Sequence, residues 1–174
     1  MFKIKRLDAV AATDLVPQLC DLLGDAVNDG ASIGFLPPLD GEEAAEYWRG
    51  VINAVDAGST LLLAAFDSGD LIGSVQLALA MKPNAPHRAE VQKLMVQRRA
   101  RGRGVARRLM SEIEALARQN GRTLLVLDTR QGDVSEKLYS SIGYIRVGAI
   151  PGYVYNADGT MSATVVYYRQ LEGM

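Results

Sequence analysis

The sequence is poor in the residues on which metal sites and disulfides depend. It contains one cysteine, Cys20, and one histidine, His87, among 174 residues. A single cysteine excludes an internal disulfide and a cysteine-based zinc site, and a single histidine excludes a histidine-rich metal site. No apolar run approaches the roughly 20 residues that span a bilayer, and no secretory apolar core follows the basic N-terminus. We therefore expect a cytoplasmic protein that binds neither a metal nor a membrane.

The sequence also lacks a large excess of charge of either sign. Its 19 Lys and Arg residues nearly balance 20 Asp and Glu residues, which gives a net charge of −1. This balance argues against a general nucleic-acid binder. Hydrophobic residues make up 48% of the chain, enough for a sizeable core, and no repeat or long linker divides it. A chain of this length suits one domain, so we expect a single domain over residues 1–174.

The spacing of apolar residues predicts a mixture of strands and helices. A period near 3.6 indicates helices, whereas alternating or continuous short apolar runs indicate strands. Asp40, followed by Glu43, is expected to cap the second helix. The order of the elements predicts an α/β sandwich with a mixed sheet. The expected strands are 2–7, 60–66, 71–80, 90–96, 124–127, 144–150 and 163–170, and the expected helices are 12–28, 41–56, 103–120 and 134–141.

The most distinctive segment is rich in arginine and glycine and lies between a predicted strand and a predicted helix. The stretch from Val91 to Ser111 contains seven basic residues and no acidic one. Gly102 and Gly104 allow a tight turn that brings several N–H groups close to a ligand. The helix that begins there directs the positive end of its dipole to the same place. The segment therefore predicts a phosphate or pyrophosphate site, with a solvated basic helix face as the alternative.

The spacing Arg-x-x-Gly-x-Gly over residues 99–104 resembles the acyl-CoA signature of the GCN5-related N-acetyltransferases (GNAT family). A P-loop would need Lys-Ser or Lys-Thr, which the chain lacks, and a dinucleotide fingerprint would need glycine where Arg107 stands. The resemblance extends to Tyr139, followed by Gly143 and an aromatic residue, and to the order of elements. It implies the GNAT fold, in which a mixed, mostly antiparallel central sheet carries helices on both faces.

A narrower resemblance is to the tabtoxin-resistance acetyltransferases. It rests on residues 30–35, 88–96 and 146–153, together with Asp158-Gly159. Those enzymes resemble one another more widely than they share a substrate, so the resemblance leaves the acceptor open.

The family resemblance implies acetyl-CoA as the co-substrate. Backbone amides of residues 101–106 would bind its pyrophosphate, with added contacts from arginine side chains. The pantetheine arm would pair with Leu94 and Val96 in a gap opened by a strand bulge, and the amide near Met95 would donate to the thioester oxygen. Many relatives carry Asn where this chain has Gly132. The expected cofactor-binding residues are Leu94, Met95, Val96, Arg101, Gly102, Arg103, Gly104, Val105 and Ala106.

The resemblance also implies catalytic roles for three side chains. Tyr139 would protonate the departing thiolate, and Glu90 or Asp128 would serve as the general base for the amine. Each has a simpler interpretation. Tyr139 would then be a packed aromatic residue, Glu90 would pair with Arg88 or Lys93, and Asp128 would cap a turn. The two carboxylates could instead hold the substrate ammonium.

An apolar and aromatic acceptor pocket is predicted from Ser32, Phe35 and Tyr153, and it suits a small amine better than a long peptide. We expect direct transfer of an acetyl group, in a ternary complex, to the primary amine of a small molecule; an amino-acid-like toxin or antibiotic is one candidate. The alternatives are a protein or peptide N-acetyltransferase and a CoA sensor without catalysis. A nucleic-acid partner is not expected, because no aromatic residues interleave the arginines. The chain could act as a monomer or a homodimer.

Overall fold

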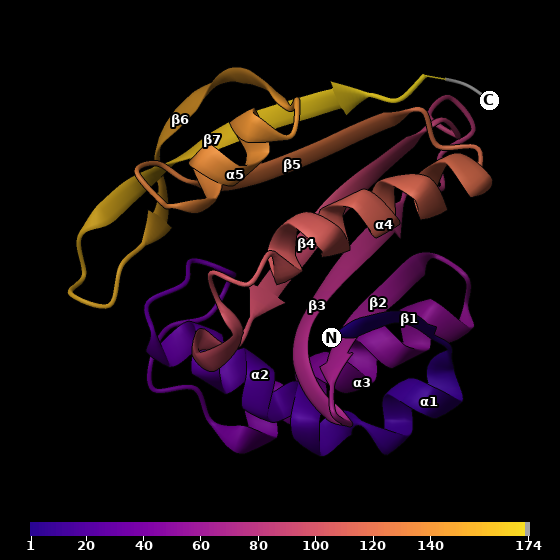
Figure 1. Ribbon diagram of the computed structural model, residues 1–174. Helices are drawn as coiled ribbons and strands as arrows, with labels where there is room; N and C mark the ends of the chain where they lie inside the picture. The colour runs from indigo at the N-terminus through magenta and orange to yellow at the C-terminus, as the bar shows by residue number, and fades with distance from the viewer. Residues whose placement is uncertain (173–174) are drawn as a thin grey trace.

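The computed structural model describes residues 1–172 and centres on one seven-stranded sheet of order β1-β2-β3-β4-β5-β7-β6 (Figure 1). All neighbouring strands are antiparallel except β4 and β5, which are parallel. The predicted mixed, mostly antiparallel sheet is therefore confirmed. The strands are β1 (Lys3–Leu7), β2 (Thr60–Asp67), β3 (Asp70–Leu79), β4 (Arg88–Val96), β5 (Leu124–Arg130), β6 (Ile145–Tyr155) and β7 (Met161–Gln170).

Helices cover both faces of the sheet, as predicted (Figure 1). One core lies under α4 and α5, and a second core lies under α1, α2 and α3. Alternate residues of β2 enter the two cores, Leu63 the first and Leu62 the second, which explains the continuous apolar run of that strand. The helices are α1 (Ala9–Asp14), α2 (Val16–Asn28), α3 (Gly41–Asp56), α4 (Val105–Gln119) and α5 (Ser135–Ser141), with a short 3-10 turn, η1 (Arg98–Ala100).

Capping side chains and a proline set several helix ends, and the first predicted helix differs from the observed ones. The single helix predicted over 12–28 is wrong, because α1 and α2 are separate helices that meet at Leu15. Pro17 has no N–H and its ring would clash with the preceding turn, so it can stand only at the start of a helix. Asp8 caps α1 by accepting a hydrogen bond from the amide of residue 11 at 2.8 Å, and Asp40 caps α3 as predicted.

The helix predicted from residue 103 begins later, at Val105. Gly104 precedes it with φ +81°, in the left-handed region, so this residue cannot continue a right-handed helix. Several strands are also longer than predicted. β6 continues to Tyr155 and β7 begins at Met161, β5 continues to Arg130, β4 begins at Arg88, and β2 gains one residue at its end. No helix within residues 1–172 combines the length and apolarity needed to cross a membrane.

A bulge in β4 creates the opening on which the site depends. Ser74 pairs with Met95 and Gln76 pairs with Gln92, so two residues of β4 stand opposite the single β3 residue between them. One of the two, Lys93, has a φ of +50°. The extra residue bends β4, and its pairing with β5 is confined to the first three residues of each strand. Beyond these residues the two strands separate toward their carboxyl ends (Figure 1).

Candidate active site

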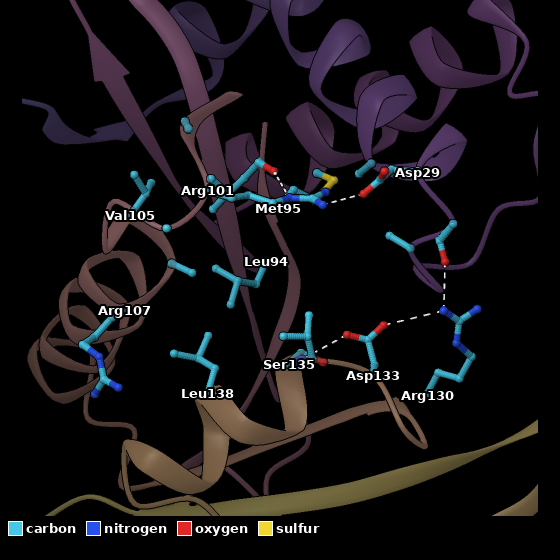
Figure 2. Close-up of a pocket in the computed structure, with 18 of the residues that line it drawn as sticks. Asp29, Leu94, Met95, Arg101, Val105, Arg107, Arg130, Asp133, Ser135 and Leu138 are labelled. Carbon is cyan, nitrogen blue, oxygen red and sulfur yellow. Dashed lines mark hydrogen bonds and ion pairs between the residues drawn. The ribbon is translucent and has the colours of Figure 1, made fainter. Parts of the chain in front are cut away.

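A cavity of about 660 Å³ lies at the opening between β4 and β5. Its wall combines the end of β4, the start of α4, the residues that follow α2, and α5 (Figure 2). Its lining combines apolar side chains with the backbone of the glycine loop, the two kinds of surface that the predicted pantetheine arm and pyrophosphate would need. The cavity collects all but one of the residues predicted to bind the cofactor: Leu94, Met95, Val96, Arg101, Gly102, Gly104, Val105 and Ala106.

The glycine loop presents an uncapped helix end to this cavity. Gly102 and Gly104 have φ values of +74° and +81°, which residues with a side chain rarely adopt. A Cβ atom at either position would meet nothing within 4 Å, so backbone conformation and not lack of space requires the glycines. At the N-terminus of α4, no side chain within residues 1–172 forms a capping hydrogen bond. Its first N–H groups and the positive end of its dipole are therefore available to an anion.

The arginines of this loop are held mainly by carboxylates from distant parts of the chain. The acidic partners come from α2, from the residue that follows it, and from the β2–β3 turn. Arg103, which was predicted to bind the cofactor, is outside the cavity lining, because its guanidinium pairs with the end of β2 at 2.5 Å. The arginines thus fasten the loop to the first half of the fold, and the backbone amides of the loop are not engaged by these ion pairs. The pairs are Arg98–Asp25, Arg99–Asp70, Arg101–Asp29 and Arg103–Asp67.

The free edge of β4 supplies backbone groups to the cavity. Gln97 donates its N–H to the carbonyl of Ile72 on β3 at 2.9 Å. Because successive strand residues turn their peptide groups to opposite sides, those of Val96 and Leu94 face the gap. The carbonyl of Val96 accepts a hydrogen bond from Arg101 Nε at 3.2 Å, and Figure 2 shows Arg101 reaching on to Asp29. Near Met95, the amide that faces the gap is consequently that of Leu94.

A second cavity, of about 330 Å³, adjoins the first and shares Leu94 and Ser135 with it. It brings together residues from five parts of the chain: the loop after α2, β4, β5, α5 and the β6–β7 pair. All three predicted catalytic side chains line it, as do two of the three predicted acceptor residues. These are Glu90, Asp128 and Tyr139, with Ser32 and Tyr153.

The two carboxylates in this cavity have different surroundings. Asp128, an exposed residue of β5, accepts a hydrogen bond from the buried Thr164 hydroxyl at 2.6 Å. Glu90 is half-buried on β4, and within residues 1–172 it forms no ion pair with Arg88 or Lys93. Among the residues that the structure describes, the Glu90 carboxylate thus has no ion-pair partner.

Tyr139 is at the same time a core residue and part of the cavity wall. It is 7% exposed, and its ring centroid lies 5.9 Å from that of Tyr144 and 6.0 Å from that of Tyr167. Burial, with smaller contributions from Asp133 and Asp128, raises the pKa of Tyr139 well above its usual value. The hydroxyl consequently keeps its proton at physiological pH and can donate a hydrogen bond into the cavity.

Phe35 departs from the predicted arrangement, because it lines a third cavity, of about 380 Å³, and not the one that holds the carboxylates. Its ring packs edge-on against Tyr47 at 5.2 Å. Ser32 lines both of these cavities and connects them. The acceptor side of the site therefore extends from the carboxylates toward the tip of the β6–β7 pair.

Sequence reasoning assigned no role in the acceptor pocket to Lys93 or Arg130. Arg130 lines all three cavities, donates a hydrogen bond to the carbonyl of Gly30 at 3.0 Å and pairs with Asp133 at 3.7 Å (Figure 2). Lys93 lines the second cavity with its side chain half-buried. Only the basic character of both residues was visible in the sequence. No group of three or more potential metal ligands occurs within residues 1–172.

The profile of the acetyltransferase (GNAT) family matches residues 26–144, more than half of the chain. An uncharacterized N-acetyltransferase of the hisH-hisA intergenic region of Azospirillum brasilense is 35% identical to this chain over 130 residues, which cover 74% of this chain and 75% of the relative.

Solved structures support the same fold at low sequence identity. An N-acetyltransferase from Staphylococcus aureus superposes with a TM-score of 0.82 at 16% identity, covering 99% of each chain. A ribosomal-protein-alanine N-acetyltransferase from Brucella melitensis gives 0.80 at 20% identity, covering 97% of this chain and 99% of its own. A protein assigned as an acetyltransferase from Salmonella typhimurium, solved with its cofactor acetyl-CoA, gives 0.78 at 17%, covering 100% and 96%. The chain thus belongs to the GNAT family and is an acetyl-CoA-dependent N-acetyltransferase.

Proposed function

We propose that the chain transfers the acetyl group of acetyl-CoA directly to the primary amine of a small molecule, within one ternary complex and one domain. The observation that carries this proposal is the junction of two cavities at Leu94 and Ser135. One cavity has the uncapped helix end and free strand edge that suit a CoA molecule. The other has the carboxylates that suit an amine. No thiol lines either cavity within residues 1–172, which favours direct transfer over a cysteine-bound acetyl group.

The first cavity would hold the donor through backbone groups. The amides of residues 101–106 would bind the pyrophosphate at the start of α4. The peptide groups of Leu94 and Val96 would pair with the pantetheine arm along the free edge of β4. Bound acetyl-CoA supplies an activated acetyl group as a thioester. An amide that faces the gap would polarise the thioester oxygen, and such a donor contributes about 3–4 kcal/mol of transition-state stabilisation.

The second cavity would prepare the amine. An alkyl amine has a pKa of about 10, so only about one molecule in a thousand is neutral at pH 7. Glu90 or Asp128, directly or through water, would take the proton and leave the lone pair free. Tyr139 would donate to the developing thiolate. Burial raises the pKa of Tyr139, so its hydroxyl stays protonated and would be available to donate a hydrogen bond to the sulfur.

The size of the second cavity favours a small acceptor. A volume of about 330 Å³ suits a molecule of amino-acid size better than a folded protein segment. An amino-acid-like toxin or antibiotic is one candidate of this size, and its acetylation would give the protein a role in resistance. The ribosomal-protein-alanine N-acetyltransferase from Brucella melitensis, which shares the fold, makes a peptide N-terminus the alternative.

CoA release from acetyl-CoA across a panel of amines tests the proposal. The panel contains amino acids, β-lactam amino-acid toxins, polyamines, aminoglycosides and peptide N-termini, and mass spectrometry identifies each acetylated product. We expect release with one class of small amine. Release with peptides alone would favour the alternative acceptor, and tight acetyl-CoA binding without release from any amine would favour a sensor.

A further inference from the structure

Lys93 places an ammonium group in the wall of the acceptor cavity. The β4 bulge holds its backbone at a φ of +50°, which sets its side chain apart from those of a regular strand. Its Nζ lies 5.7 Å from the ring centroid of Phe35 and 5.6 Å from that of Tyr47. Both contacts are of the cation–π type. Gly34 completes the enclosure, because a Cβ atom there would lie only 3.3 Å from Nζ.

This ammonium group has no anionic partner among residues 1–172. No carboxylate lies within 4.0 Å of Lys93 Nζ, whereas four arginines of the following loop each pair with a carboxylate. Burial lowers the pKa of Lys93, and the more distant charges of Asp128 and Glu90 oppose that shift. The ammonium group has therefore lost part of its hydration without gaining an ion-pair partner. Such burial costs free energy, and an anionic group of a ligand would offset that cost.

The charges around the cavity form a complementary set. Lys93 provides a cation from the bulge, and Glu90 and Asp128 provide anions from β4 and β5 in the same wall. Arg130 does not offer a second free cation, because it already contacts the carbonyl of Gly30 and pairs with a carboxylate. The third carboxylate of the lining, Asp133, is the one paired with Arg130. Apart from that pair, the described lining has two carboxylates and one ammonium group without an ion-pair partner, which matches a ligand that carries both an amine and an anionic group.

We propose that Lys93 binds a carboxylate, or a comparable small oxyanion, of the acceptor, so that the preferred acceptor is a small zwitterion with its amine at Glu90 and Asp128. This inference rests on the proposed function and specifies its substrate class. It makes polyamines and aminoglycosides, which carry only positive charge, poor acceptors, because their second ammonium group would face Lys93.

The test compares matched acceptors on the wild-type protein. Each L-amino acid is assayed beside its amide and its decarboxylated amine, with CoA release as the readout. A hydrogen bond to a charged group corresponds to about a 10- to 100-fold change in affinity, so we expect kcat/KM to favour the acid by about that factor. Lys93→Met should abolish most of this preference through KM, whereas Lys93→Arg should restore part of it. Lys137→Met removes an exposed lysine of α5 and serves as the control.

The outcomes separate this inference from the proposed function. Preference for the amide or the decarboxylated amine would overturn the zwitterion inference alone, as would a preference for the acid that Lys93→Met leaves intact. No release with any amine would overturn the proposed function and this inference together. Calorimetry with acetyl-CoA and the melting temperature report whether Lys93→Met is folded, and the wild-type comparison remains decisive if it is not.

Discussion

Replacing Gly104 with valine tests the assignment of the pyrophosphate to the start of α4. Gly104 has a φ of +81°, and a Cβ atom there would meet nothing within 4 Å, so the substitution introduces backbone strain without a clash. The left-handed region costs an L-residue about 1–2 kcal/mol, and a β-branched residue is a particularly poor fit. Without a ligand the loop can relax and turn its amides away from the cavity.

Binding of acetyl-CoA must then restore the strained conformation or lose contacts with the amides. Either route costs about 1–2 kcal/mol, which corresponds to about a 5- to 30-fold increase in Kd. Isothermal calorimetry with acetyl-CoA measures this change directly. Hydrogen exchange at residues 102–106 should rise in the variant if the helix start has relaxed.

Gly159 provides a matched control, because its φ is +82° and its Cβ position is equally open, but it lies in the β6–β7 turn. Gly159→Val should lower the melting temperature by about 2–4 °C for each kcal/mol lost and leave the Kd for acetyl-CoA unchanged. Wild-type affinity in Gly104→Val, with the protein folded, would refute the assignment of the pyrophosphate to this loop.

Three further predictions concern the other site residues. Tyr139→Phe should lower kcat by about 10²-fold or more with little change in acetyl-CoA affinity; unchanged turnover would show that the hydroxyl has no catalytic part. Comparing Glu90→Gln with Asp128→Asn should identify the base, because only its loss should lower kcat by about 10²-fold or more; wild-type turnover in both variants would exclude the pair. Arg103→Ala should leave the acetyl-CoA Kd within about 2-fold, since its guanidinium pairs with Asp67 outside the cavity. The hydrogen bond from Arg103 lowers the pKa of Asp67 below 3.8. The Arg103–Asp67 pair thus stabilises the fold at pH values above 3.8, and this stabilisation is lost as the pH falls through the lowered pKa of Asp67. The melting temperatures of Arg103→Ala and wild type should therefore converge in acid. A gap that persists there would contradict the linkage.

Local signals in the sequence accounted for most of the architecture. The two-faced apolar run of β2, the cap at Asp40 and the apolar stripe of α4 each depend on neighbours within a few residues, and the structure has all three. The sequence analysis did not predict the break between α1 and α2, because the helical spacing of apolar residues continues across it. Pro17 indicates the break, since proline is tolerated only in the first turn of a helix. The prediction of one continuous helix was therefore wrong because it relied on periodicity and gave no weight to the proline.

The partners of the arginine loop could not be predicted from the sequence. The stretch around Arg101 contains no acidic residue, which suggested a purely anion-binding surface. Its carboxylate partners Asp29 and Asp67 lie far away in the chain, and only the packing of α2 and β2 against the loop brings them near. The same holds for Asp128 and Thr164, which β5–β7 pairing places within hydrogen-bond distance.

The sequence by itself determined the glycine loop before the amphipathic helix α4, because consecutive residues build it, and this loop is the anion site that we propose for the donor. The acceptor side was decided by the tertiary structure. The Lys93 ammonium group has no ion-pair partner among residues 1–172, because a bulge turns its backbone and because rings from α3 and from the loop before it enclose its side chain. Burial and charge pairing arise from segments distant in the chain, so their effects on a side chain exist only after folding.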